Sequence, residues 1–164
     1  MRQADKQDIL KLTDIYEDAR LYGEDVGVID WPKPINELFI QDLIATNELY
    51  CFDSEDRVVA AAKLSTNPDV RIWGSENIPA LYLAKLATSS EVRGRGYLRQ
   101  EMIPAIQNYA GQDTALRLEC LAENSKLISF YQRLGFTALG EAQFYSDKQL
   151  SDITVMRFEK QASV

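Results

Sequence analysis

Residues 80–99 read ALYLAKLATSSEVRGRGYLR, and this stretch decides the fold class. The first nine residues are nearly all apolar, which is typical of a strand covered on both faces of a sheet. Gly94 and Gly96 then permit a sharp turn, and apolar residues at helical spacing predict a helix over 97–110. Another strand is predicted at 115–121. This order of elements indicates a right-handed parallel crossover inside a mixed sheet.

Further helices and strands are predicted on both sides of the crossover. The predicted helices cover 5–23, 35–43, 97–110 and 125–134. The predicted strands cover a short opening segment, 49–52, 57–65, 80–88, 115–121, 136–140 and 153–158. Residues 66–79 carry no clear signal. The expected fold class is α/β (α+β), and a chain of 164 residues suits one domain over 1–164.

Composition bounds the cellular setting. The chain has no apolar run near the roughly 20 residues that cross a bilayer, and its first residues lack the apolar core of a secretory signal. A cytoplasmic location is expected. Cys51 and Cys120 lie far apart in apolar stretches, so each is expected to be a small buried side chain rather than half of a disulfide.

The charge and the missing histidine exclude several functions. A formal net charge of −7 argues against general affinity for nucleic acid or for an anionic membrane, since both need a clustered basic surface. The chain has no histidine, which removes the commonest metal ligand and the usual base of serine or cysteine nucleophiles. No metal is therefore expected, and proton transfer is left to carboxylate, tyrosine, lysine, cysteine or water.

The turn at 93–99 has the chemistry of an anion site. The first N–H groups of a helix have no partner inside it, and together with the helix dipole they favour a phosphate. Arg93, Arg95 and Arg99 add positive charge in an otherwise acidic chain. A dinucleotide fingerprint would need glycine at Arg99, and no Gly-Lys-Ser/Thr loop is present.

A second segment joins the strand at 115–121 to the next helix. Asn124 is a natural N-cap, and Tyr131 lies seven residues later, about two helical turns, so both side chains can project from one face. Gly135 stands where the helix should end. By itself this pattern also fits a capped helix with a tyrosine in the core.

Together the two segments resemble the acyl-CoA binding motifs of the GNAT N-acyltransferases. The family signature is Gln or Arg, two residues, Gly, one residue, then Gly or Ala, after a strand, and Arg93 and Gly96 match it. Leu98 replaces the last Gly or Ala, so its side chain could crowd the pyrophosphate or shift the helix start. The resemblance covers 80–136 well and the opening helices loosely.

The second family motif is a strand, an Asn, and a helix that carries Tyr and ends in Gly-Phe. Asn124, Tyr131, Gly135 and Phe136 reproduce that order. The resemblance implies a mixed, mostly antiparallel sheet flanked by helices, with the parallel crossover at the acetyl-CoA site. The residues that it assigns to that site are Leu86, Ala87, Thr88, Arg93, Gly94, Arg95, Gly96, Tyr97, Leu98, Arg99 and Asn124.

The same resemblance implies transfer of an acetyl group from acetyl-CoA to a primary amine by direct attack. Backbone N–H groups near Leu86 to Thr88 would polarise the thioester carbonyl. Glu119, on a different sheet face from Leu118 and Cys120, would take the proton of the amine, with Glu123 and water as alternatives. Tyr131 would return a proton to the thiolate.

The acceptor is less defined. In similar proteins the first two helices and the loop before the last strand wall the acceptor site, which here offers Tyr22, Asp25, Asp30, Trp31, Phe144 and Tyr145. A small-molecule amine and a peptide amine both fit, and a homodimer is left open. The alternative function is a non-catalytic CoA-binding sensor or regulatory module, which would share the 93–96 turn but would not need Tyr131 or a strand carboxylate.

Overall fold

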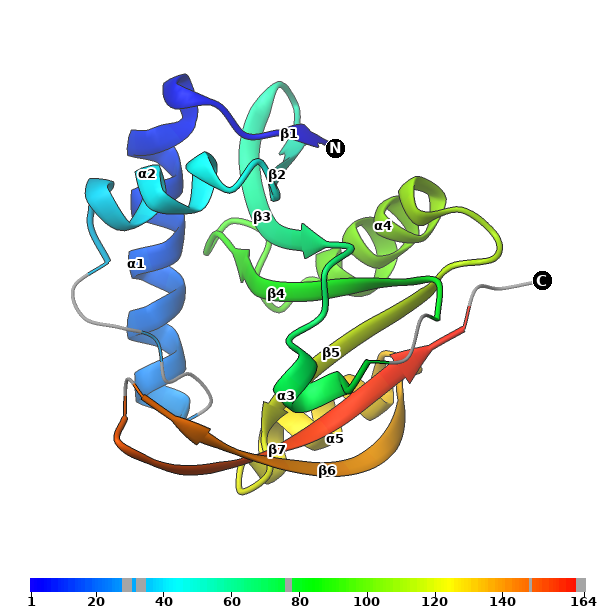
Figure 1. Cartoon of the computed structure of the whole chain (residues 1–164). Helices are drawn as coiled ribbons and strands as arrows, with labels where there is room; N and C mark the ends of the chain where they lie inside the picture. The colour runs from blue at the N-terminus through cyan, green and yellow to red at the C-terminus, as the bar shows by residue number, and fades with distance from the viewer. Residues whose placement is uncertain (28–30, 32–34, 76–77, 148, 162–164) are drawn as a thin grey trace. The chain divides into compact units, whose positions relative to one another are not determined.

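The structure is a computed structural model that describes residues 1–27, 31, 35–75, 78–147 and 149–161. The chain divides into two compact units. The first unit comprises Met1–Leu64 and Ala84–Ile106, and the second comprises Ser65–Leu83 and Gln107–Val164. Strand β4 (Ala80–Thr88) contributes residues to both (Figure 1).

The strands follow the order β1-β2-β3-β4-β5-β7-β6 in a seven-stranded sheet. The pairs β1–β2, β2–β3, β5–β7 and β6–β7 are antiparallel, whereas β4 and β5 are parallel. The predicted α/β architecture, mostly antiparallel with one parallel crossover, is therefore confirmed.

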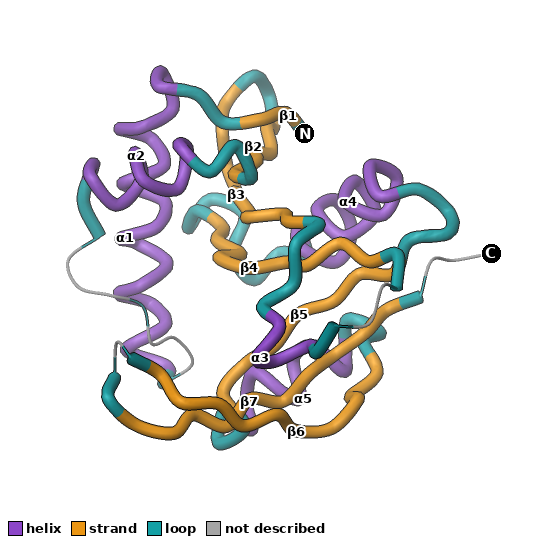
Figure 2. The backbone as a smooth tube through the Cα atoms, viewed as in Figure 1, coloured by secondary structure: helices purple, strands orange, loops and turns teal. Residues whose placement is uncertain are grey.

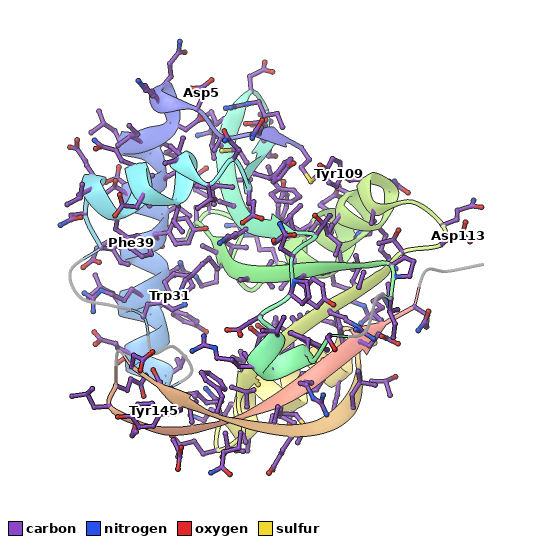
Figure 3. All side chains as sticks on the ribbon, viewed as in Figure 1. Asp5, Trp31, Phe39, Tyr109, Asp113 and Tyr145 are labelled. Carbon is purple, nitrogen blue, oxygen red and sulfur yellow. The ribbon has the colours of Figure 1, made fainter. Side chains whose placement is uncertain are left out.

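The first unit places helices α1 and α2 beside a hairpin (Figure 1). Its elements are β1 (Arg2–Gln3), a 3₁₀ turn η1 (Lys6–Asp8), α1 (Ile9–Val26), α2 (Glu37–Ala45), β2 (Leu49–Ser54), β3 (Arg57–Ser65), the end of β4, a π-helix η2 (Leu98–Met102) and the start of α4 (Ile103–Ala110). Leu12, Ile15 and Tyr16 of α1 are fully buried in one core with Ile40 of α2. The Tyr16 ring lies 5.3 Å from that of Trp31, which Figure 3 labels beside α1.

The start of the 3₁₀ turn η1, which leads into α1, and the C-terminal end of α1 each have a local cause. Asp5 accepts a hydrogen bond from the Gln7 N–H at 2.7 Å, and Asp8 accepts one from the Asp5 N–H at 2.9 Å, which completes a capping box. The helix runs past the end predicted near Gly23, because the left-handed residue that stops it is Gly27, at φ +69°.

The second unit carries a long hairpin and two helices. Its elements are α3 (Val70–Trp73), the start of β4, β5 (Ala115–Leu121), α5 (Ser125–Arg133), β6 (Thr137–Ser146) and β7 (Ser151–Lys160). Figure 2 shows β6 and β7 as two long neighbouring strands, which pair antiparallel. Both strands are longer than predicted, because polar Glu141 and Gln143 lie on the exposed face of an edge strand and do not end it.

The helix α3 and the exposure of one helical residue differ from the predictions. Residues 70–73, inside the segment without a clear signal, form α3, with Asp69 as its N-cap. The apolar spacing of the helix predicted over 97–110 places Tyr109 on the buried face, but Tyr109 is 53% exposed. Cys51 and Cys120 are buried and free, as predicted. Among the helices in the described ranges, none is long and apolar enough to cross a membrane.

Candidate active site

The turn after β4 is built by two left-handed glycines, Gly94 at φ +73° and Gly96 at φ +81°. Its backbone N–H groups divide into two sets. Those of Val92, Arg93, Arg95 and Gln100 donate to backbone carbonyls. No acceptor within the described part of the chain meets the N–H groups of Gly94, Gly96, Tyr97, Leu98 and Arg99. N–H groups without a partner at the start of a helix favour binding of a phosphate, so this turn has the chemistry of a phosphate site.

The arginines of the turn differ in role. Arg93 donates to Asp18 at 2.6 Å and to the Thr88 carbonyl at 2.8 Å, and its guanidinium lies 4.7 Å from the Tyr22 ring centre. Arg93 therefore braces the turn against α1, and its contact with the cofactor stays a prediction. Arg95 and Arg99 are exposed and form no ion pair with any described residue, so they are the cations available to an anion.

Leu98 coincides with an unusual start of the helix. The Ile103 N–H donates to the Leu98 carbonyl, a five-residue step, and Leu98–Met102 forms a π-helix before α4. The expectation that Leu98 would shift the helix start is consistent with this geometry. Space is tight at Gly96, where an added Cβ would lie 3.1 Å from the side-chain nitrogen of Gln100.

The end of β4 is irregular. Lys85 adopts φ +52° inside the strand, and its carbonyl accepts the Tyr16 hydroxyl at 2.7 Å. Pairing of β4 with β5 covers only Ala80–Tyr82. Beyond Tyr82, strand β4 has no hydrogen-bonded partner in β5. This side of the strand near Leu86, Ala87 and Thr88 is therefore open to a ligand carbonyl. Ala87 is buried, and Leu86 and Thr88 are half-buried.

A shallow hollow of about 460 Å³ lies next to the turn in the first unit. It is lined by Asp53, Ser54, Glu91, Val92, Arg95, Tyr97, Gln100 and Glu101. Three of these side chains are acidic and one, Arg95, is basic, so the wall of the hollow carries a net negative charge.

Glu119 occupies β5 in the second unit. It is half-buried, whereas its neighbours Leu118 and Cys120 are buried, which fits the predicted alternation of faces. The indole N–H of Trp73 donates to Glu119 Oε2 at 3.1 Å. Burial raises the pKa of Glu119 above its ordinary value, the Trp73 hydrogen bond opposes that rise, and the nearby Asp69 charge adds to it.

Asn124 and Tyr131 are both placed by α5. Asn124 Oδ1 accepts the Leu127 N–H at 3.0 Å, so Asn124 is the predicted N-cap. The Tyr131 ring lies 5.6 Å from the Phe158 ring and 6.1 Å from the Phe136 ring, and the residue is 9% exposed. Burial raises the pKa of Tyr131, so its phenol stays protonated at neutral pH.

The residues expected to wall the acceptor site differ in exposure and in packing. Tyr22 and Tyr145 are about half exposed, Trp31 packs on Tyr16, and Phe144 lies under the Arg71 guanidinium at 4.8 Å. Asp25 is exposed, and Asp30 lies outside the described residues.

Trp73 was missed by sequence reasoning, although Asp69 followed by Val-Arg-Ile-Trp carries a weak capping signal. Its partner Glu119 stands 46 residues later, beyond the range of any local pattern. In the described part of the chain no group of three or more His, Cys, Asp or Glu side chains could hold a metal ion.

Known proteins share both sequence and fold with this chain. A family model described as "Acetyltransferase (GNAT) family" matches residues 11–136. The N-acetyltransferase YesJ of Bacillus subtilis is 26% identical, over 77% of this chain and 80% of that protein.

Solved structures agree on the fold. A GNAT-family acetyltransferase from Streptococcus agalactiae superposes with a TM-score of 0.77 at 20% identity, covering 99% of this chain and 95% of that chain. The Salmonella typhimurium protein yncA, solved with its cofactor acetyl-CoA, has a TM-score of 0.65 at 16% identity and covers 99% and 93% of the two chains.

Proposed function

Because the chain belongs to the acetyltransferase (GNAT) family, we propose that it transfers an acetyl group from acetyl-CoA to a primary amine of a small molecule or peptide. The observation that carries the proposal is a set of backbone N–H groups that meet no acceptor among the described residues, those of Gly94, Gly96, Tyr97, Leu98 and Arg99. They lie beside Arg95 and Arg99, which form no ion pair with a described residue. The acetyl-CoA bound to yncA adds support from a protein of the same fold.

Acetyl-CoA supplies an activated acetyl group as a thioester. In the proposal the N–H groups of Gly94 and of Gly96 to Arg99 bind its phosphates, with the Arg95 and Arg99 side chains adding charge and Arg93 fixing the turn. Backbone N–H groups near Leu86, Ala87 and Thr88 polarise the thioester carbonyl. Asn124 keeps the start of α5 in place through its cap. Leu98 leaves its own N–H available despite its side chain.

Glu119 accepts the proton of the amine in this proposal. An alkylamine near pH 7 is mostly protonated, so a base must act before or during attack. Burial favours Glu119 over Glu123, because Glu119 is half-buried with a raised pKa, whereas Glu123 is exposed. Attack forms the new C–N bond and breaks the C–S bond, and the proton that Tyr131 donates goes to the departing sulfur.

We also propose that the two units act as one domain over 1–164 in the cytoplasm. The family model runs from 11 to 136 and so includes segments of both units. A net charge of −7 supports an amine partner over a nucleic acid or an anionic membrane.

Coenzyme A or acetyl-CoA is expected to raise the melting temperature, whereas NADH is not. A ligand at 100 times its Kd stabilises the native state by about 2.7 kcal/mol, which in a chain of this size corresponds to roughly 5–10 °C. Differential scanning fluorimetry at millimolar ligand measures the shift. No shift with either CoA ligand, together with a clear shift from NADH, would overturn the cofactor assignment.

A further inference from the structure

Trp73 occupies the centre of a polar and aromatic cluster in the second unit. Its indole N–H donates to Glu119, the Arg117 guanidinium lies 5.1 Å from its ring centre, and the Tyr82 ring meets it edge-on at 5.3 Å. Trp73 is 7% exposed, so this arrangement is fixed by packing. The cluster has no role yet in the proposed reaction.

We propose that Trp73 is a positioning residue for acetyl transfer, in which its indole N–H holds Glu119 Oε2 and leaves Oε1 to accept the proton of the amine. The inference rests on the proposed function, in which Glu119 is the base. Among described residues, the indole is the one donor to this carboxylate, and Oε1 meets none. Holding Oε2 in place also fixes the direction of Oε1, and a general base must be oriented toward the proton that it accepts.

The guanidinium groups of Arg117 and Arg157, on β5 and on the neighbouring strand β7, are bound to other groups. Arg117, two residues before Glu119 on β5, pairs with Glu159 at 2.7 Å. Arg157, directly opposite Glu119 on β7, donates to the carbonyls of Ile72, Gly140 and Glu141. A guanidinium on Glu119 would hold both oxygens and depress its pKa by about 1–3 units. The neutral indole orients the carboxylate and preserves its basicity.

Several charged and titratable groups near Glu119 can influence its pKa. The titratable and charged groups that face it or flank it are Asp69, the N-cap of α3, Arg71 on α3, Tyr82 on β4, Arg117 and Cys120 on β5, Tyr131 on α5, and Arg157 and Glu159 on β7. Trp73 stabilises the charged form of Glu119. Its removal must therefore raise the pKa of Glu119 further, toward neutrality.

The first test uses the unaltered chain. Only two tryptophans, Trp31 and Trp73, are present, so an ¹⁵N spectrum shows two indole N–H signals that W31F and W73F assign. The Trp73 signal is expected to move with pH at the same midpoint as the ¹³C carboxyl signal of Glu119, and to stop moving in E119Q. A Trp73 signal that does not follow Glu119 overturns the proposal, whether or not W73F folds.

The second test compares W73F with Y82F, which deletes a hydroxyl from the same cluster. W73F should raise the pKa of Glu119 by about 1 unit, the value expected for one lost hydrogen bond to a charged group, and Y82F should leave it unchanged. In a plot of kcat/KM against pH, the rise that E119Q abolishes should shift to higher pH in W73F, by the same amount as the pKa. Equal pKa values in W73F and the unaltered chain contradict the proposal.

Failure of this inference and failure of the proposed function can be told apart. The NMR titrations need no substrate, so they judge the Trp73–Glu119 contact even in a protein that acetylates nothing. An undiminished rate of acetyl transfer in E119Q would overturn the positioning role, because Trp73 would then orient a carboxylate that the reaction does not use. The proposed function, acetyl transfer, would still stand.

Discussion

Replacing Gly96 with aspartate is expected to raise the Kd for acetyl-CoA about a hundredfold or more. The substitution adds a negative charge among the N–H groups proposed to bind phosphate, and charge-assisted hydrogen bonds contribute about 1.5–3 kcal/mol each. It also forces a side chain onto a backbone at φ +81°, where the new Cβ would lie 3.1 Å from the Gln100 side chain. Calorimetric titration of the folded variant measures the loss.

Two variants separate charge from strain. Gly96→Ala carries the same backbone strain and the same contact without the charge, so its loss should be smaller. Gly111→Asp adds the same side chain at another left-handed glycine, at φ +90° with open space around the new Cβ, and should bind acetyl-CoA normally. Unchanged binding in Gly96→Asp would place the phosphate site elsewhere.

Tyr131→Phe is expected to lower kcat about a hundredfold, the low end for loss of a general acid. The ring contacts with Phe130, Phe136 and Phe158 do not involve the hydroxyl, so stability and cofactor affinity should stay nearly unchanged. Burial makes this phenol a weaker acid than free tyrosine, and a thiolate of pKa about 8.5 leaves tolerably even without a proton. Both facts keep the expected loss modest.

The leaving group decides what the Tyr131 hydroxyl does. The defect of Tyr131→Phe should shrink with an acetyl thioester whose thiol is more acidic than that of coenzyme A. A defect of equal size with both thioesters would mean that Tyr131 positions the substrate. A rate equal to that of the unaltered chain would return Tyr131 to a packing role.

Local sequence patterns predicted the elements whose causes are local. The apolar run of β4 and the cap at Asn124 depend on residues within a few positions of each other, and both elements have the predicted bounds to within a residue. The turn was likewise predicted from Gly94 and Gly96, because glycine adopts the left-handed backbone that both residues show.

Other features depend on contacts that the sequence does not display. The four-residue helix α3 is too short for periodicity, and Trp73 becomes important only because the fold brings Glu119 to its indole. The ion pair of Arg93 with Asp18, 75 residues away in the sequence, is likewise beyond the range of a local motif. The left-handed Lys85 inside β4 is likewise invisible, since lysine carries no conformational signal for that backbone.

Amine-dependent release of the CoA thiol tests the central claim most directly. The full chain is incubated with acetyl-CoA and a panel that includes an alkylamine, an amino acid, an amine-bearing antibiotic and a peptide N-terminus, and thiol release is followed alongside the mass of the amine. Thiol release is expected with at least one amine, matched mole for mole by the N-acetylated product of that amine and reduced in Tyr131→Phe. Acetyl-CoA that binds but yields no thiol with any amine class would contradict that claim and favour a non-catalytic CoA-binding module.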